Sequence, residues 1–171
     1  MTNTKLNKWD DFKLPRWDTL PGIDLYLDQV IELINGYLAP VTPADEKKIL
    51  TASMLNNYVK QDLMPAPIKK KYSRQHLVFL IVITLMKQTF TLSEIKSVLT
   101  EALAHQSIKA FYDAFCDKQE KALHFVENFQ TTESEMAAAQ PDAQLEELVT
   151  MAISTSLYSK QLIADLIGTE E

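Results

Sequence analysis

Apolar residues recur at helical spacing through most of this chain, whereas the alternation of apolar and polar residues that marks a half-buried strand is nearly absent. Residues 23–38 place their apolar side chains on one broad face. Residues 74–88 are apolar nearly all round, which is typical of a helix at the centre of a fold. Thr91 or Ser93 can cap a further helix. The pattern predicts an all-α, mainly helical fold with a small β wing near residues 67–72.

Residues 51–61 predict a short helix with two different faces. Thr51 is a good N-cap, because its hydroxyl can accept a hydrogen bond from a backbone N–H group of the first turn. A preceding helix is expected over residues 42–49, with Pro43 at its first position, so that the two would form a helix-turn-helix. The face expected to pack carries Met54, Leu55, Tyr58 and Val59, and the face expected to meet solvent carries Ser53, Asn56, Asn57 and Lys60.

The polar face of this helix suits the major groove of DNA. Asn56 and Asn57 can each pair with an adenine edge through two hydrogen bonds, and Ser53 lies on the same side. Lys60 can reach guanine or phosphate. An ordinary solvated helix surface would show a similar composition, so the face alone supports either interpretation.

A basic segment follows this helix. Pro65 and Pro67 end the helix, and four cations then occur within six residues. Cations at the position of a wing can hold the phosphates of DNA. Tyr72 can anchor the wing in the core or donate to a phosphate, and the two roles are compatible. The four cations are Lys69, Lys70, Lys71 and Arg74.

Charge is distributed unevenly along the chain. The net charge of −6 by itself disfavours contact with DNA. Residues 44–100, however, hold nine Lys and Arg against four acidic residues, whereas residues 101–171 hold four against thirteen. Charges separated by more than about 10 Å are screened at ordinary salt, so the local excess governs phosphate contact. The basic middle and the acidic end therefore predict separate roles.

Residues 51–77 resemble the DNA-binding half of the MerR-type regulators. In outline that family reads Thr/Ser-x-x-x-Leu-Arg-Tyr-Tyr-Glu-x-x-Gly-Leu-x-Pro, followed by a wing ending in Arg-x-Tyr-Ser and then a helix. The resemblance implies a MerR-like winged helix-turn-helix that binds double-stranded DNA as a homodimer formed through a C-terminal helix. The matching positions are Leu55, Tyr58, Leu63, Pro65, Lys70, Tyr72 and Ser73, and Thr91–Leu99 is similar to the start of the family's next helix.

This segment departs from the MerR pattern in three ways. Asn56 stands where an arginine is usual, Asp62 replaces the turn glycine, and the wing is shorter and contains no glycine. Aspartate can adopt the left-handed backbone conformation, so we expect the turn at Asp62 to persist.

The whole chain also resembles an uncharacterised family of small proteins from Gram-positive bacteria. The resemblance rests on residues 14–17, 25–30, 56–60 and 71–74, which read LPRW, LYLDQV, NNYVK and KYSR. It implies a cytoplasmic location and supplies no established activity.

An acidic helical region is predicted over residues 105–171. Its first helix carries a heptad seam, with spacings of four and three. The seam can pack within the chain or form a homodimer, and both remain open. A last helix is expected from Pro141, after an N-terminal arm at 1–22 and a MerR-like domain at 23–104. The seam consists of Ile108, Tyr112, Phe115, Gln119, Ala122, Val126 and Phe129.

No arrangement of residues indicates an enzyme. Only three glycines occur and none lies in a phosphate-binding loop, which disfavours nucleotide chemistry. His76 and His105 have no partner at catalytic or ligand spacing. We expect no cofactor and no metal. An acidic group is expected to be a solvent-facing ridge rather than a metal site, and it consists of Asp113, Cys116, Asp117, Glu120 and His124.

The single cysteine, Cys116, and the lack of a secretory signal or membrane span predict a cytoplasmic globular protein. The leading hypothesis is a DNA-binding transcriptional regulator with a MerR-like layout. The alternative is a helical protein-interaction module that retains the helix-turn-helix shape without binding DNA. The operator, the effector and the choice between activation and repression stay open.

Overall fold

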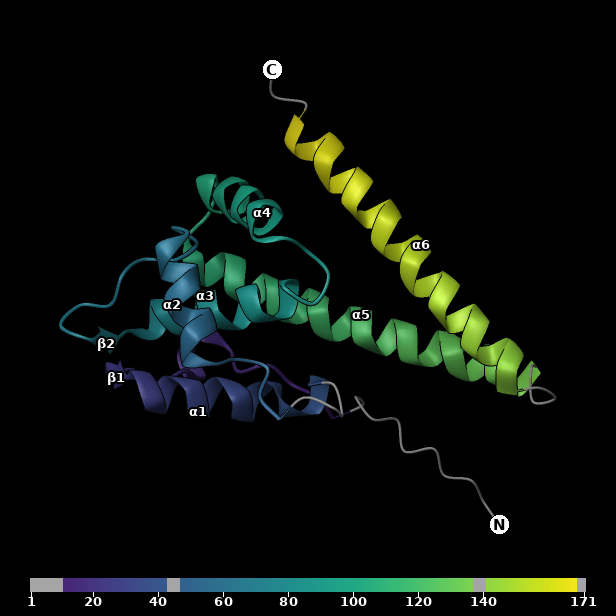
Figure 1. The fold of residues 1–171 in the computed structure, drawn as a ribbon, viewed down its shortest axis with the longest axis horizontal. Helices are drawn as coiled ribbons and strands as arrows, with labels where there is room; N and C mark the ends of the chain where they lie inside the picture. The colour runs from purple at the N-terminus through teal and green to yellow at the C-terminus, as the bar shows by residue number, and fades with distance from the viewer. Residues whose placement is uncertain (1–10, 43–46, 137–140, 169–171) are drawn as a thin grey trace, which may run out of the picture.

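The computed structural model describes residues 11–42, 47–136 and 141–168, without the side chains of residues 127–136, 141–148 and Tyr158. Helices dominate these residues, which confirms the predicted mainly helical fold (Figure 1). In chain order the elements are η1 (Trp17–Thr19), β1 (Leu25–Tyr26), α1 (Leu27–Leu38), η2 (Ala39–Val41), α2 (Ala52–Lys60), β2 (Lys71–Tyr72), α3 (Arg74–Met86), α4 (Leu92–Ala104), α5 (Ile108–Met136) and α6 (Pro141–Gly168).

Helix α3 lies at the centre of the fold, as its apolar sequence predicts. Every residue from His76 to Thr84 is buried, and both α1 and α5 contact this helix. Each fully buried aliphatic side chain contributes roughly 1.5–3 kcal/mol relative to an exposed one. One helix buried on all sides therefore provides the surface on which the other elements assemble.

The helix predicted over residues 23–38 begins later, at Leu27. Strand β1 precedes it and pairs antiparallel with β2, so that Tyr26 lies opposite Lys71. The backbone N–H of Tyr26 donates to Gln29 Oε1 at 2.9 Å, which caps the start of α1. Tyr26 falls within the apolar face predicted for residues 23–38, but its side chain is exposed. Helical periodicity does not reveal a two-residue strand whose partner lies far along the chain.

The first helix of the predicted pair, over residues 42–49, is not present at residues 47–50, and residues 43–46 lie outside the description. Helix α1 is instead the neighbour of α2. The side-chain amide of Asn35 on α1 holds the connection, because it donates to the Leu50 carbonyl at 2.8 Å and accepts from the Leu50 N–H at 3.1 Å. Helix α1 therefore takes the place beside α2 that was expected for residues 42–49, although residues 39–51 separate the two helices.

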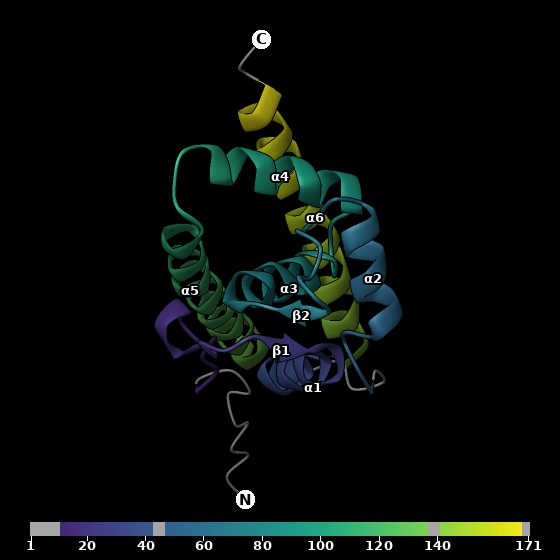
Figure 2. The ribbon, with the colours of Figure 1, turned by 90° about the vertical axis from the view of Figure 1, so that its left-hand side faces the viewer.

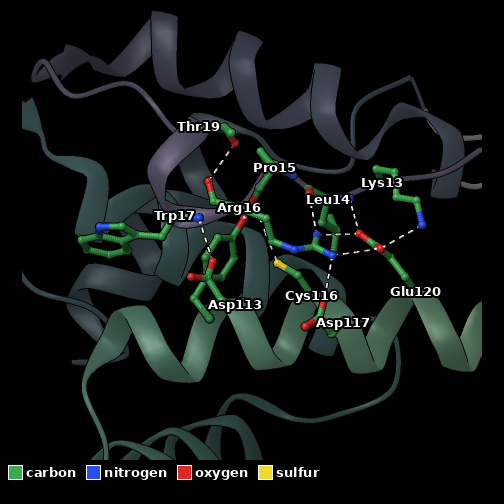
Figure 3. Close-up of polar contacts among 11 residues, drawn as sticks. Lys13, Leu14, Pro15, Arg16, Trp17, Thr19, Asp113, Cys116, Asp117 and Glu120 are labelled. Carbon is green, nitrogen blue, oxygen red and sulfur yellow. Dashed lines mark hydrogen bonds and ion pairs between the residues drawn. The ribbon is translucent and has the colours of Figure 1, made fainter.

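The N-terminal arm packs on α5 through Glu120, which is only 5% exposed (Figure 3). This carboxylate accepts hydrogen bonds from the backbone N–H of Leu14 at 2.8 Å and from Arg16 Nη1 at 2.7 Å. Lys13 Nζ lies 3.2 Å from its other oxygen. These donors offset the free-energy cost of burying the carboxylate. Residues 13–16 of the arm are therefore a structural part of the domain.

The prediction that the acidic group on α5 faces solvent is wrong for Asp113, Cys116 and Glu120, which face the arm, whereas Asp117 is exposed as predicted. Cys116 is fully buried, and Asp113 Oδ1 accepts from the Trp17 backbone N–H at 2.9 Å (Figure 3). Hydrophobic periodicity predicted that the carboxylates face solvent. This periodicity contains no signal for an ion pair with an arginine that is distant in the sequence. Among the described residues no group of three His, Cys, Asp or Glu side chains could hold a metal ion.

The predicted heptad seam on α5 divides into two parts. Tyr112 is fully buried, and its phenol donates to the Pro15 carbonyl at 2.7 Å. Ala122 and Val126 are exposed, and Phe129 lies outside the described side chains. The first part of the seam therefore packs within this chain, while its continuation presents an apolar surface.

Helix α6 begins at Pro141, as predicted, and returns from the far end of α5 to α4 (Figure 1). Lys160 Nζ lies 3.4 Å from Glu94 Oε2 on α4. None of the described helices combines the length and the apolar character needed to cross a membrane. Large apolar side chains remain exposed along α6, and they include Val149, Ile153, Leu157 and Leu162.

Replacing Glu120 by Gln tests the contact between the arm and α5. Burial alone would raise the pKa of Glu120, but hydrogen bonds from Arg16, Leu14 and Lys13 outweigh it and hold the pKa at about 2, below the ordinary 4.5. A carboxylate with a lowered pKa contributes stability that is complete above its unfolded pKa and is lost as the pH falls through the folded value. We expect Glu120→Gln to lower the free energy of unfolding by about 3 kcal/mol at pH 7.

The matched control is Asp117→Asn, because Asp117 also pairs with Arg16, at 2.7 Å, but is exposed to solvent. Its loss should be below about 1 kcal/mol. Urea denaturation as a function of pH measures both effects. The difference between wild type and Glu120→Gln should shrink as the pH falls from 4.5 towards 2. Equal losses in the two variants, or a difference independent of pH, would contradict the assignment.

Candidate nucleic-acid interface

Helix α2 has the two faces that its sequence predicts. Thr51 Oγ1 accepts a hydrogen bond from the Met54 N–H at 3.3 Å, which confirms the N-cap. Leu55 and Tyr58 are buried, and burial raises the pKa of the Tyr58 phenol. The opposite face is open to solvent over its whole length, and its exposed residues are Ser53, Asn56, Asn57 and Lys60.

The turn after α2 takes the conformation expected of it. Asp62 has a φ of 54°, so the left-handed turn persists without glycine. The next residue closes the turn, because the Leu63 N–H donates to the Tyr58 carbonyl at 3.0 Å. Leu63 and Met64 are buried directly afterwards. The end of α2 is thus fixed to the core while its polar face stays free.

A two-residue hairpin carries the lysine segment. Ile68 and Lys71 exchange two backbone hydrogen bonds of 3.1 and 2.9 Å. Between them Lys69 and Lys70 have φ values of 50° and 63°, the geometry of a type I′ turn. Asn-Gly is the favoured sequence at such a turn, and an ordinary side chain there costs about 1–2 kcal/mol. Two exposed lysines in a strained turn are typical of a binding site rather than of a stabilising turn.

The outward face of this small sheet is both apolar and cationic. Cross-strand neighbours share a face, so Tyr26, Lys71 and Ile68 form a row. Lys71 Nζ lies 5.1 Å from the centre of the Tyr26 ring, a cation–π contact. Ile68 is 72% exposed and Tyr26 is 56% exposed. Sequence reasoning missed Tyr26 and Ile68. Ile68 adjoins the lysines in the sequence, but only recognition of strand β1 could have placed Tyr26 beside them.

Tyr72 does not belong to the exposed surface, although it was included among the predicted DNA-binding residues. The side chain is 4% exposed, and burial raises the pKa of its phenol. Its ring packs edge-on against His76, with centroids 5.6 Å apart. His76 Nε2 lies 3.3 Å from the Ala66 carbonyl, so the same imidazole also holds the segment before the hairpin. Of the two roles considered for Tyr72, the structure supports the anchor.

Arg74 also lies apart from the hairpin lysines. Its guanidinium carbon is 5.6 Å from the centre of the Trp17 ring, in the N-terminal arm. Arg74 Nη2 lies 3.2 Å from the position a Cβ would take at Gly22, so the arm passes very close to this side chain. The buried Nε has no hydrogen-bond partner. Of the four predicted wing cations, only Lys69, Lys70 and Lys71 belong to the hairpin.

The hairpin and α2 occupy the same end of the molecule, opposite the end where α5 passes into α6 (Figures 1 and 2). This end combines an amide-rich helix face with a projecting cationic hairpin. We call the residues Ser53, Asn56, Asn57, Lys60, Ile68, Lys69, Lys70 and Lys71 the α2–hairpin surface.

A family model described as "Domain of unknown function (DUF1836)" matches residues 15–115. The chain belongs to this family, and the match includes the arm from Pro15 onward, α1 to α4 and the start of α5. A search of the curated proteins and a search of the solved structures each return no match.

The hairpin turn should be stabilised by the sequence that its geometry favours. We expect the double substitution Lys69→Asn with Lys70→Gly to raise the free energy of unfolding by about 1–2 kcal/mol, because Asn and Gly adopt positive φ with less strain. Lys69→Ala with Lys70→Ala is the control, since it removes both charges and keeps the strain. Urea denaturation distinguishes the two. If the Ala pair stabilises as much as the Asn-Gly pair, charge repulsion rather than backbone strain is the cause.

Proposed function

We propose that this DUF1836 protein is a DNA-binding transcriptional regulator with a MerR-like layout. The observation that carries the proposal is the α2–hairpin surface, in which an exposed amide face and two lysines held in a strained turn occupy the same end of the molecule (Figure 1). Strain at an exposed site persists only where the surrounding structure imposes it, and strained residues cluster at functional sites. Duplex DNA is the ligand that suits both parts of this surface, because it is a polyanion whose base edges can be distinguished by hydrogen bonds.

Helix α2 is the proposed reading element. A helix fits the major groove of B-form DNA, where base edges differ in their donors and acceptors. Asn56 and Asn57 supply the donor and acceptor pairs that suit adenine, and Lys60 suits guanine or phosphate. On the opposite side of α2, Leu55 and Tyr58 are buried in the core, so the polar face is presented on a rigid helix.

The hairpin is the proposed holding element. Lys69 and Lys70 are exposed at its tip, and phosphate contacts of this kind fix a protein on the duplex without reading sequence. Ile68 and Tyr26 give the hairpin an apolar side that suits the sugar edge of the backbone. Lys71 supports this side through its contact with the Tyr26 ring. Tyr72 and Arg74 act indirectly, by anchoring the hairpin and the arm.

The order of elements supports the proposal. Strand β1, helices α1 and α2, a hairpin, and then α3 and α4 follow one another as in a winged helix-turn-helix. The sequence resemblance to MerR-type regulators falls on the same α2 and hairpin segments. Asn56 in place of the usual arginine would change which bases are read rather than where the helix lies.

A homodimer is part of the proposal. Val149, Ile153 and Leu157 are spaced four residues apart on α6, and all three are exposed. Such an apolar stripe is typical of a helix that packs against another helix. Two copies joined through this region would present two α2 helices to two half-sites. A cytoplasmic location follows from a role on chromosomal DNA.

The net charge of −6 favours a second candidate, a helical protein-interaction module that does not bind DNA. In that case the α2–hairpin surface would bind an acidic protein segment. The protein-interaction module would be the better explanation if the wild-type protein, with its fold intact, failed to bind duplex DNA at low salt.

Substitutions on the two parts of the surface should separate reading from holding. Asn56→Ala and Asn57→Ala should flatten the preference among sequences by about 1–3 kcal/mol per lost base contact and leave nonspecific affinity nearly unchanged. Lys69→Ala and Lys70→Ala should weaken all sequences alike and reduce the slope of log K against log salt by about one unit each. Selection from random duplexes, followed by fluorescence anisotropy at several salt concentrations, measures both effects.

Lys118→Ala is the matched control for the lysine variants, because Lys118 is an exposed lysine on α5, away from the hairpin. It should leave the salt slope unchanged. A slope that falls equally for Lys118→Ala would show that binding is diffuse, and an undiminished preference in both Asn variants would remove α2 as the reading element.

A charge on the α6 stripe should break the homodimer. Ile153→Glu and Leu157→Glu should each give a monomer, because dimerisation would bury an unpaired carboxylate. Ser154→Glu is the control, since Ser154 is exposed on the same helix but off the stripe. Light scattering after size exclusion measures the mass, and circular dichroism checks that the helices persist. A wild-type chain that is monomeric at high micromolar concentration would contradict the dimer.

A further inference from the structure

A pocket of about 450 Å³ opens between the turn that follows α2 and helix α4. Cavities of this size are within the range that binds small ligands. Its walls are mainly apolar, and they include Val59, Leu63, Met64, Phe79, Leu99 and Leu103. None of these residues belongs to the α2–hairpin surface.

The apolar walls are formed by the core itself. Leu63, Met64 and Leu99 are each less than 6% exposed, and Phe79 from α3 is only 9% exposed. These core side chains form one side of the pocket in the structure without a ligand. A preformed apolar pocket costs little conformational entropy on binding.

Two opposite charges stand among the lining residues. Asp62 lies on the turn after α2 and Lys96 lies on α4, and both are exposed. Lys96 Nζ is 3.3 Å from the carbonyl oxygen of Gln61, the residue next to Asp62 in the chain. The Lys96 ammonium therefore lies beside the turn that carries Asp62. Within the described residues the Asp62 carboxylate has no ion-pair or hydrogen-bond partner, and Lys96 has no carboxylate partner.

We propose that this pocket binds a free α-amino acid with a large apolar side chain. The ammonium group of such a ligand would pair with Asp62, its carboxylate with Lys96, and its side chain would enter the apolar interior. A fatty acid would leave Asp62 unpaired, and an apolar amine would leave Lys96 unpaired. An α-amino acid is the small molecule that carries both charges two bonds from an apolar group.

The left-handed conformation of Asp62 suits this role. With a φ of 54° Asp62 ends α2, and the residue lines the pocket. The pocket also touches the proposed reading helix, since Val59 lines it and the next residue, Lys60, faces outward. A bound amino acid would thereby influence the end of α2. This last consequence rests on the proposed DNA-binding function, whereas ligand binding does not.

Titration of the full chain with L-phenylalanine or L-leucine, without DNA, tests the proposal. Backbone NMR shifts should map to residues 59–66 and 96–103, and calorimetry should give the affinity. Asp62→Asn removes the charge and keeps the turn, because asparagine also tolerates positive φ. Lys96→Gln removes the other charge on an exposed helix surface. Each variant should weaken binding about threefold to fivefold, as expected for loss of one ion pair at a solvent-exposed site.

Two ligands that each lack one charged group identify which ligand charge pairs with Asp62 and which pairs with Lys96. N-acetyl-L-phenylalanine lacks the ammonium group, so it should bind Asp62→Asn and wild type equally. L-phenylalaninamide lacks the carboxylate, so it should bind Lys96→Gln and wild type equally. Absence of shifts at 10 mM amino acid, or affinities insensitive to both substitutions, would overturn the proposal. Either result would be independent of whether the protein binds DNA.

Discussion

The burial of α3 on all sides is the constraint on which the rest of the structure depends. Strand β2 leads directly into this helix, so the hairpin is attached to the most buried part of the chain. Ser73 and His76 form the joint: the imidazole accepts from the Ser73 N–H and reaches the Ala66 carbonyl before the hairpin. The exposed lysines therefore project from a rigid base, and their position does not depend on the flexibility of a loop.

Stability and binding make opposite demands on the same hairpin. Lysine is a poor residue for positive φ, and the Lys69–Lys70 turn contains two of them in succession. The chain tolerates this strain because the core beneath is well packed and because Tyr72 anchors the adjoining strand. Helix α2 shows no such conflict between stability and binding, since its buried and exposed residues lie on opposite faces of a regular helix. The strained turn is consequently the more specific indication of function.

Much of the fold follows from local sequence. The N-cap at Thr51, the central α3 and the start of α6 were predicted from patterns within a few residues, and the left-handed turn at Asp62 from the resemblance to MerR-type regulators. Long-range pairs were not predictable in this way. The β1–β2 pairing displaced the start of α1, and the contact of Arg16 with Glu120 turned an expected solvent ridge into an interface. Of the candidate site residues, the α2 face was correctly exposed, whereas Tyr72 and Arg74 were drawn into packing by partners distant in sequence.

Backbone NMR of the wild-type protein, titrated with a random DNA duplex at low salt, tests the central claim most directly. The account predicts shift changes concentrated at residues 53–60 and 68–71, with the arm, the Glu120 contact and α6 unaffected. Those changes should disappear as salt is added, because released counterions drive the contact. A protein that shows no changes at low salt, or changes confined to residues outside these two segments, would contradict the assignment of the α2–hairpin surface to DNA.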